Sequence, residues 1–192
     1  DIYNPCLVYD PDSDLLWLSS RNTVWIFDAS LNLRKSAYIP EDCHITSMTV
    51  SKSEKAHMVM ATTKGIYALG KDMEVTKIGE HLTGSRNIPF ITTSPIDGTT
   101  IALVEGKGIM RIYDDLTVEH IAETDISYDS TILGFLSDRN HLWISPDNIS
   151  VYSYPLYSHY RSEKYKHIES FFSKKTFQVF RCNCYFLLII FH

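Results

Sequence analysis

One pattern recurs four times along the chain and constrains its fold more than any single residue does. Each unit contains short runs of apolar and β-branched residues, separated by turns rich in Asp, Asn, Gly, Pro and Lys. One set of turns lies near positions 12, 54, 97 and 139, and a second set lies near positions 21, 64, 107 and 147. Within each set, successive turns are 40 to 43 residues apart, so two independent markers keep the same period.

A period of about 42 residues with four strands per unit is typical of the blades of a β-propeller. The second strand of a unit has apolar residues at both of its alternating sets of positions, as in residues 15–18, which fits a sheet covered on both faces. An antiparallel sandwich of about sixteen strands is the alternative, but a sandwich does not require a fixed period. We therefore predict an all-β chain: a partial β-propeller of about four four-stranded blades over residues 1–154.

Propellers of this repeat length commonly have about seven or eight blades, so four blades predict an incomplete ring that belongs to a larger protein. Residues 155–192 lose the period and form a second region, predicted to be a short irregular or helical tail. This tail carries six basic against two acidic residues and ends in an apolar run, residues 185–191. The run is too short to span a membrane. The tail could dock on a membrane surface or on a partner protein. The alternatives are that it forms an extra strand or helix packed on the propeller, or that it is a non-native terminus.

The third strands of two units end in the tripeptides Ile26-Phe27-Asp28 and Ile112-Tyr113-Asp114, where a WD40 repeat has its Trp-Asp pair. The chain resembles a divergent WD40 propeller over residues 2–154. No unit opens with Gly-His, so the hydrogen-bond network of that family is not carried over to this sequence. The resemblance implies blades that act as a binding platform, and its Trp-containing strands are also similar to propellers of leucine-rich-repeat kinases and of some exchange factors.

Composition narrows the class of protein. A net charge of −5 gives no basic surface of the kind that binds nucleic acid. Four cysteines, unevenly spaced, are too few for a disulfide framework and favour a reducing, cytoplasmic location. No basic region followed by an apolar region opens the chain, so no signal peptide is predicted.

Two groups of residues have the types that bind metals. Asp10, Asp12 and Asp14 match the opening of a calcium loop, but the sixth and twelfth positions hold Leu15 and Arg21 instead of Gly and Glu. We expect these carboxylates to shape the first turn. Cys182, Cys184 and His192 offer soft ligands at the end of the chain, without the second pair that a zinc site requires. The sequence thus predicts no metal and no cofactor.

Motifs of common enzymes are absent from the sequence: it has no G-x-S-x-G elbow, P-loop or H-E-x-x-H. Gly106 and Gly108 are interpreted as a hairpin turn, because no helical pattern follows them. The histidines, His57 among them, are scattered near strand edges. A stripe of aromatic residues at matched strand positions is interpreted as core between blades: Trp17, Trp25, Tyr67, Tyr113, Trp143 and Tyr152.

These observations favour a non-catalytic platform for protein–protein interaction in signalling or trafficking, with no catalytic residue. Its partners would be proteins that contact loops at the blade ends, such as residues 52–55 and 146–148. The alternative is a propeller-fold hydrolase with carboxylates near the central channel. Such an enzyme needs acidic residues on the innermost strands of several blades, and the first strands supply only Asp10.

Overall fold

The computed structural model describes residues 5–40, 42–136, 141–145 and 151–155. Its strands form four separate antiparallel sheets, each built from consecutive strands, and a single short helix, α1 (Glu80–Thr83), joins two of them. Within these ranges no helix has the length and apolarity needed to cross a membrane. The predicted all-β partial propeller is confirmed, whereas the predicted tail, apart from Pro155, lies outside the described residues.

The bounds of the strands are as follows. Blade 1 contains β1 (Cys6–Asp10), β2 (Leu15–Ser20), β3 (Thr23–Asp28) and β4 (Leu33–Tyr38). Blade 2 contains β5 (Ile45–Val50), β6 (Ala56–Thr62), β7 (Gly65–Gly70) and β8 (Val75–Ile78). Blade 3 contains β9 (Phe90–Thr93), β10 (Thr100–Val104), β11 (Gly108–Ile112) and β12 (Val118–Ala122). In blade 4 the described residues form β13 (Thr131–Leu136), β14 (His141–Ser145) and β15 (Tyr152–Pro155).

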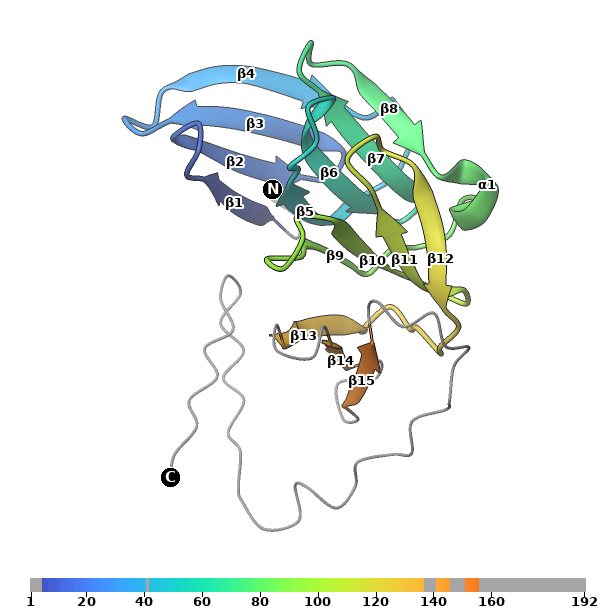
Figure 1. Ribbon diagram of the computed structural model, residues 1–192. Helices are drawn as coiled ribbons and strands as arrows, with labels where there is room; N and C mark the ends of the chain where they lie inside the picture. The colour runs from blue at the N-terminus through green and yellow to red at the C-terminus, as the bar shows by residue number, and fades with distance from the viewer. Residues whose placement is uncertain (1–4, 41, 137–140, 146–150, 156–192) are drawn as a thin grey trace.

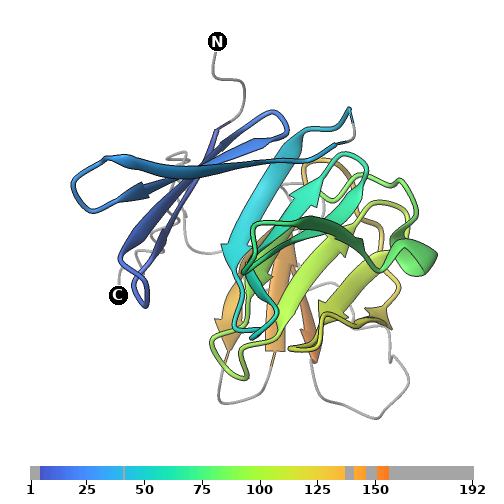
Figure 2. The same ribbon diagram turned by 90° about the horizontal axis from the view of Figure 1, so that it is seen from above.

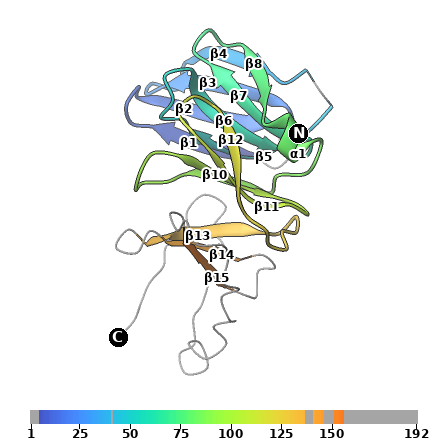
Figure 3. The same ribbon diagram turned by 45° about the vertical axis from the view of Figure 1, so that its right-hand side comes forward.

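The blades follow one another in chain order, as Figures 1 and 3 show. The first strands of blades 1, 2 and 3 are neighbours, and those of blades 2 and 3 are joined by side-chain hydrogen bonds. The hydroxyl of Ser47 donates to the carbonyl of Ile91 at 3.2 Å, and the hydroxyl of Thr93 donates to the carbonyl of Val50 at 2.7 Å. The hydroxyls of Thr49 and Thr93 lie 3.0 Å apart. Small hydroxyl side chains therefore hold the inner strands together where there is little room for larger groups.

Each sheet has two faces, which we name by direction: the front face points toward the next blade in the sequence and the back face toward the preceding one. Because side chains alternate along a strand, neighbouring residues of β6 belong to different faces. Met58 and Met60 pack on blade 1, whereas Val59 and Ala61 pack on blade 3. Both faces of β6 and β7 are thus buried, as the uninterrupted apolar runs predict.

Three apolar clusters fill the three junctions between blades and constitute the core. The second junction joins Val59 and Ile66 of blade 2 to Ile91 and Val104 of blade 3, all at most 1% exposed. Burial of one such side chain stabilises a fold by roughly 1.5–3 kcal/mol. The core therefore lies between sheets, and each blade depends on its neighbours.

The aromatic stripe divides between two environments. Trp17, Tyr67 and Tyr152 pack between blades, as predicted. For Trp25 the prediction is wrong, because Trp25 pairs with Leu18 on the back face of blade 1, where no described blade packs. It is also wrong for Tyr113, whose hydroxyl bonds the Glu119 carboxylate in an exposed position, and for Trp143, which is half-buried on the front face of blade 4.

Candidate functional site

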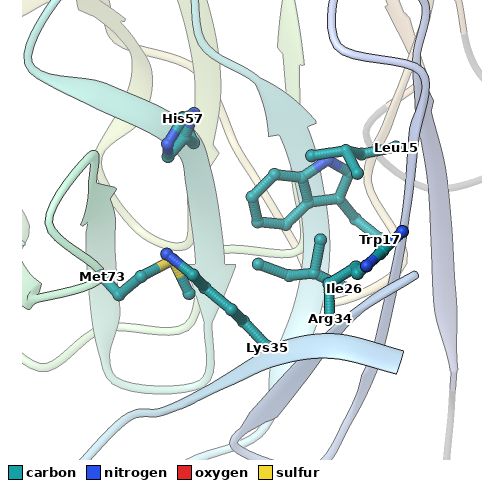
Figure 4. Close-up of a pocket in the computed structure, with 7 residues that line it drawn as sticks. All are labelled: Leu15, Trp17, Ile26, Arg34, Lys35, His57 and Met73. Carbon is teal, nitrogen blue, oxygen red and sulfur yellow. The ribbon is translucent and has the colours of Figure 1, made fainter. Parts of the chain in front are cut away.

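Two cavities adjoin at the junction of blades 1 and 2, and His57 of β6 lines both of them. One is mainly apolar, with a volume of about 250 Å³, and the other is polar, with a volume of about 300 Å³. Figure 4 shows the apolar cavity, with the imidazole of His57 and the indole of Trp17 on two of its sides. The imidazole is thus placed where an apolar surface meets a polar one.

Strands of blade 1 form most of the wall of the apolar cavity. Its lining residues are Leu15 and Trp17 of β2, Ile26 of β3, Arg34 and Lys35 of β4, His57 of β6 and Met73 of the β7–β8 turn. The rings of Trp17 and His57 are 5.8 Å apart between centroids. The indole nitrogen of Trp17 is buried and has no hydrogen-bond partner within the described residues.

Charge in the apolar cavity is positive. The Arg34 guanidinium is paired with the Asp28 carboxylate at 2.6 Å, whereas the Lys35 ammonium has no ion pair within the part of the chain that the structure describes. No carboxylate lines this cavity. An apolar wall with a free ammonium fits a ligand that has an apolar body and a negatively charged or strongly polar group.

The polar cavity contains residues from the β1–β2 turn, the β5–β6 loop and the β7–β8 turn: Asp10, Asp12, Val50, Ser51, Lys52, Ser53, Ala56, His57 and Lys71. Asp10 is only 7% exposed, and its carboxylate accepts hydrogen bonds from the Asp12 amide at 3.1 Å and the Ser13 hydroxyl at 2.5 Å. These bonds confirm that the aspartates shape the first turn. Within the described ranges, no group of acidic, cysteine or histidine side chains has the arrangement of a metal site.

The β5–β6 loop, residues 52–55, ties three blades together at this end. The Lys52 ammonium bonds the Asp12 carboxylate of blade 1 at 2.8 Å, and this hydrogen bond raises the pKa of Lys52. The Lys55 ammonium donates to the carbonyl of Asp115 at 3.2 Å, and the Ser53 hydroxyl donates to the carbonyl of Asp114. A protein contact through this loop stays a prediction. The other loop predicted to bind partners, residues 146–148, lies outside the described residues.

The two cavities bring together groups suited to proton transfer. A neutral imidazole accepts a proton as a general base, and the resulting imidazolium returns it as a general acid. Lys71 and His57 both line the polar cavity, and the Lys71 ammonium has no ion pair within the described residues. A nearby cation stabilises negative charge that develops on a substrate. The site therefore combines a base, a cation and an apolar wall.

Sequence reasoning did not single out His57, Lys35 or Lys71. They come from β6, β4 and the β7–β8 turn, and only the packing of blade 1 on blade 2 brings them together. The one usable signal was the position of His57 at the beginning of an apolar strand, where a polar side chain interrupts the run. Three residues that the sequence analysis considered as metal ligands lie outside the described residues: Cys182, Cys184 and His192.

No protein-family model matches the sequence, and no curated protein sequence is significantly similar to it. Solved structures with a similar fold include a streptogramin B lyase, with a TM-score of 0.58 and 19% identity, covering 82% of this chain and 56% of the lyase. A virginiamycin B lyase from Staphylococcus aureus has a TM-score of 0.52 and 13% identity, covering 79% and 55%. An auxiliary nutrient binding protein from Bacteroides thetaiotaomicron has a TM-score of 0.56 and 15% identity, covering 77% and 37%.

These similarities show a propeller-like fold. The chain spans 56% and 55% of the length of the two lyases and 37% of the length of the nutrient binding protein. They also correct two predictions. Because two of the three propellers are lyases, the predictions of a non-catalytic interaction platform and of a chain that is not an enzyme are wrong on this comparison.

Proposed function

We propose that this chain is part of a propeller-fold enzyme of the lyase or hydrolase type, with His57 as its proton-transfer group. The observation that carries the proposal is the position of His57 in the wall of both cavities, one of which Lys71 also lines. The likeness of the fold to two lyases supports the enzyme class. The carboxylate of Asp10, the only acidic side chain that the predicted first strands offer such an enzyme, accepts hydrogen bonds within its own turn.

The proposed reaction is an elimination. The imidazole of His57 removes a proton from carbon, the electrons of that C–H bond form a carbon–carbon double bond, and the leaving group departs with its bonding electrons. The Lys71 ammonium stabilises the negative charge that develops in the transition state. The apolar wall formed by Leu15, Trp17 and Ile26 holds the body of the substrate and excludes water from it. In the hydrolytic version, the imidazole takes its proton from an attacking water.

The test uses the two compounds that name the similar lyases, streptogramin B and virginiamycin B. Each is incubated with the purified chain, and loss of the intact compound is followed by liquid chromatography with mass spectrometry. We expect turnover, which His57→Gln lowers by at least ~100-fold, as is usual for loss of a general base. A product that has gained no water identifies elimination, and a product that has gained one water identifies hydrolysis.

The control variant is His81→Gln, which changes an exposed histidine on α1, away from both cavities. It should keep the rate of the unmodified protein. Absence of turnover of both compounds, or equal rates for His57→Gln and His81→Gln, contradicts the proposal. A WD40 identity, a cytoplasmic location and a role in signalling remain predictions from the sequence alone.

A further inference from the structure

Two β-bulges contribute side chains to the apolar cavity, one from each of the blades that meet there. Figure 2 shows blade 1, in blue, beside blade 2, in cyan and green. In β6, the pairing with β7 shifts between Ala56 and Met58, so His57 is an extra residue in the strand. Ala56 packs with the core of blade 3 and Met58 with that of blade 1, although residues two apart in a regular strand share a face. The bulge therefore accounts for the position of His57 in the cavity wall, since a bulge re-aims a side chain.

The second bulge is in β4. The pairing of β4 with β3 shifts next to Ile26, and Arg34 is the extra residue. Lys35, which follows the bulge, pairs with Ile26, and Ile26 pairs with Trp17. Trp17 and Ile26 belong to the core between blades 1 and 2. A row of side chains across the front face of blade 1 thus begins in the apolar core and ends in an ammonium at the outer strand.

The charge at this cavity selects for an anion. The Arg34 guanidinium is paired with the Asp28 carboxylate at 2.6 Å, whereas the Lys35 ammonium has no ion pair within the described residues. Figure 4 shows the Lys35 side chain extending from β4 toward the blade 2 side of the cavity. None of the described lining residues carries a carboxylate. A cation beside an apolar wall attracts negative charge more strongly than it does in open water.

The shape and the wall of the cavity fit an aromatic body. Trp17 is 1% exposed, so packing fixes its ring, which lies 5.8 Å from the ring of His57 at an angle of 41°. The thioether of Met73, on the blade 2 side, is of a kind that packs well on aromatic rings. The cavity has a volume of about 250 Å³. Since an apolar cavity of about 150 Å³ holds benzene, there is room here for a larger ring system.

We propose that the substrate of this site is an aromatic anion. Its ring system lies against Trp17 and Met73, and its anionic group accepts a hydrogen bond from the Lys35 ammonium. This inference rests on the proposed function, because it specifies the substrate class of the same site. It makes Lys35 the residue that selects the charge of the ligand, a role separate from proton transfer by His57.

Two fluorescent probes that differ in charge test the proposal on the full chain. Anilinonaphthalene sulfonate is an aromatic anion, and phenylnaphthylamine has the same rings without the sulfonate. In fluorescence titrations we expect the sulfonate probe to bind at least ~10-fold more tightly, which is the usual size of a hydrogen bond to a charged group. Lys35→Met keeps the apolar stem and should remove this preference, because it weakens binding of the sulfonate probe alone.

The matched control is Lys107→Met, which makes the same change at an exposed lysine in the β10–β11 turn of blade 3. It should keep both affinities. A second measurement needs no variant: added salt should weaken binding of the sulfonate probe to the unmodified protein, and not that of the uncharged probe.

Three results overturn the proposal: equal affinities of the two probes for the unmodified protein, binding of neither probe, or equal effects of Lys35→Met and Lys107→Met. The titrations involve no turnover, so their outcome is separate from that of the turnover test of His57. A preference for the sulfonate that depends on Lys35, without turnover, would contradict the proposed enzyme and leave a binding site for aromatic anions.

Discussion

Gly108, the first residue of β11, occupies a position where no side chain fits. Its φ is +96°, and a Cβ atom there would lie 2.1 Å from the carbonyl oxygen of Ala122 and 2.8 Å from the amide nitrogen of Thr124. Gly106 lies in the same hairpin turn with a φ of +66°, but a Cβ atom added to it meets nothing within 4 Å. The two glycines therefore form a natural matched pair.

We predict that Gly108→Ala destabilises the chain by more than about 2 kcal/mol, because both the backbone angle and the neighbouring strand must change. Gly106→Ala should cost about 1 kcal/mol, the usual cost of a left-handed conformation for a residue with a Cβ. The measurement is the free energy of unfolding in urea. Equal costs for the two substitutions contradict the close contact with β12.

The hairpin turn between β3 and β4 depends on one carboxylate. The Asp28 side chain accepts hydrogen bonds from the backbone amides of Ser30 and Asn32, both at 2.9 Å, and it pairs with Arg34 at 2.6 Å. The bonds from Asn32, more than the charge of Arg34, hold the pKa of Asp28 below its ordinary value of 3.8. The folded chain therefore binds a proton at this carboxylate less readily than the unfolded chain does.

This shift gives a stability that depends on pH. A lowered pKa contributes stability that is present above pH 3.8 and is lost as the pH falls through the lower pKa of the folded state. We predict that Asp28→Asn makes the unfolding midpoint in urea less dependent on pH between about pH 4 and pH 2. Asp42→Asn, at an exposed aspartate outside the turn, is the control and should keep the original acid dependence. If Asp28→Asn also keeps it, the turn does not act through this carboxylate.

The whole molecule is a row of sheets in which each blade contacts its neighbours along the chain. Stability in such a repeat structure is a sum of contributions from blades and from the junctions between them. Blades 2 and 3 have two filled junctions each, whereas the back face of blade 1 has none among the described residues. The middle of the row is therefore the most stable part of the molecule.

Hydrogen exchange measures this difference. We predict that backbone amides of β6, β7, β10 and β11 exchange slowest. Amides of β2 and β3 should exchange at least ~10-fold faster, because blade 1 opens without breaking the second and third junctions. Uniform protection over all blades would mean that the chain unfolds as one unit, contrary to this expectation.

The positions of the strands followed from local chemistry and were predicted within one or two residues at most ends. The turns at Gly65 and Gly106 and the apolar runs of β6 and β10 are visible in the sequence, because turn residues and side-chain alternation act over a few residues. The four residues of α1 were missed, since no helical period fits so short a segment.

The sequence by itself determined the period, the turns and therefore the number of blades, because these depend on contacts between residues close along the chain. The tertiary structure alone decided which face of each strand meets which blade. That choice buried Trp17, exposed the face that holds Trp25, and brought His57 of blade 2 to Lys35 of blade 1. The physical reason is that the junctions join side chains about one full repeat apart, and no local pattern records which of two apolar faces will have a partner.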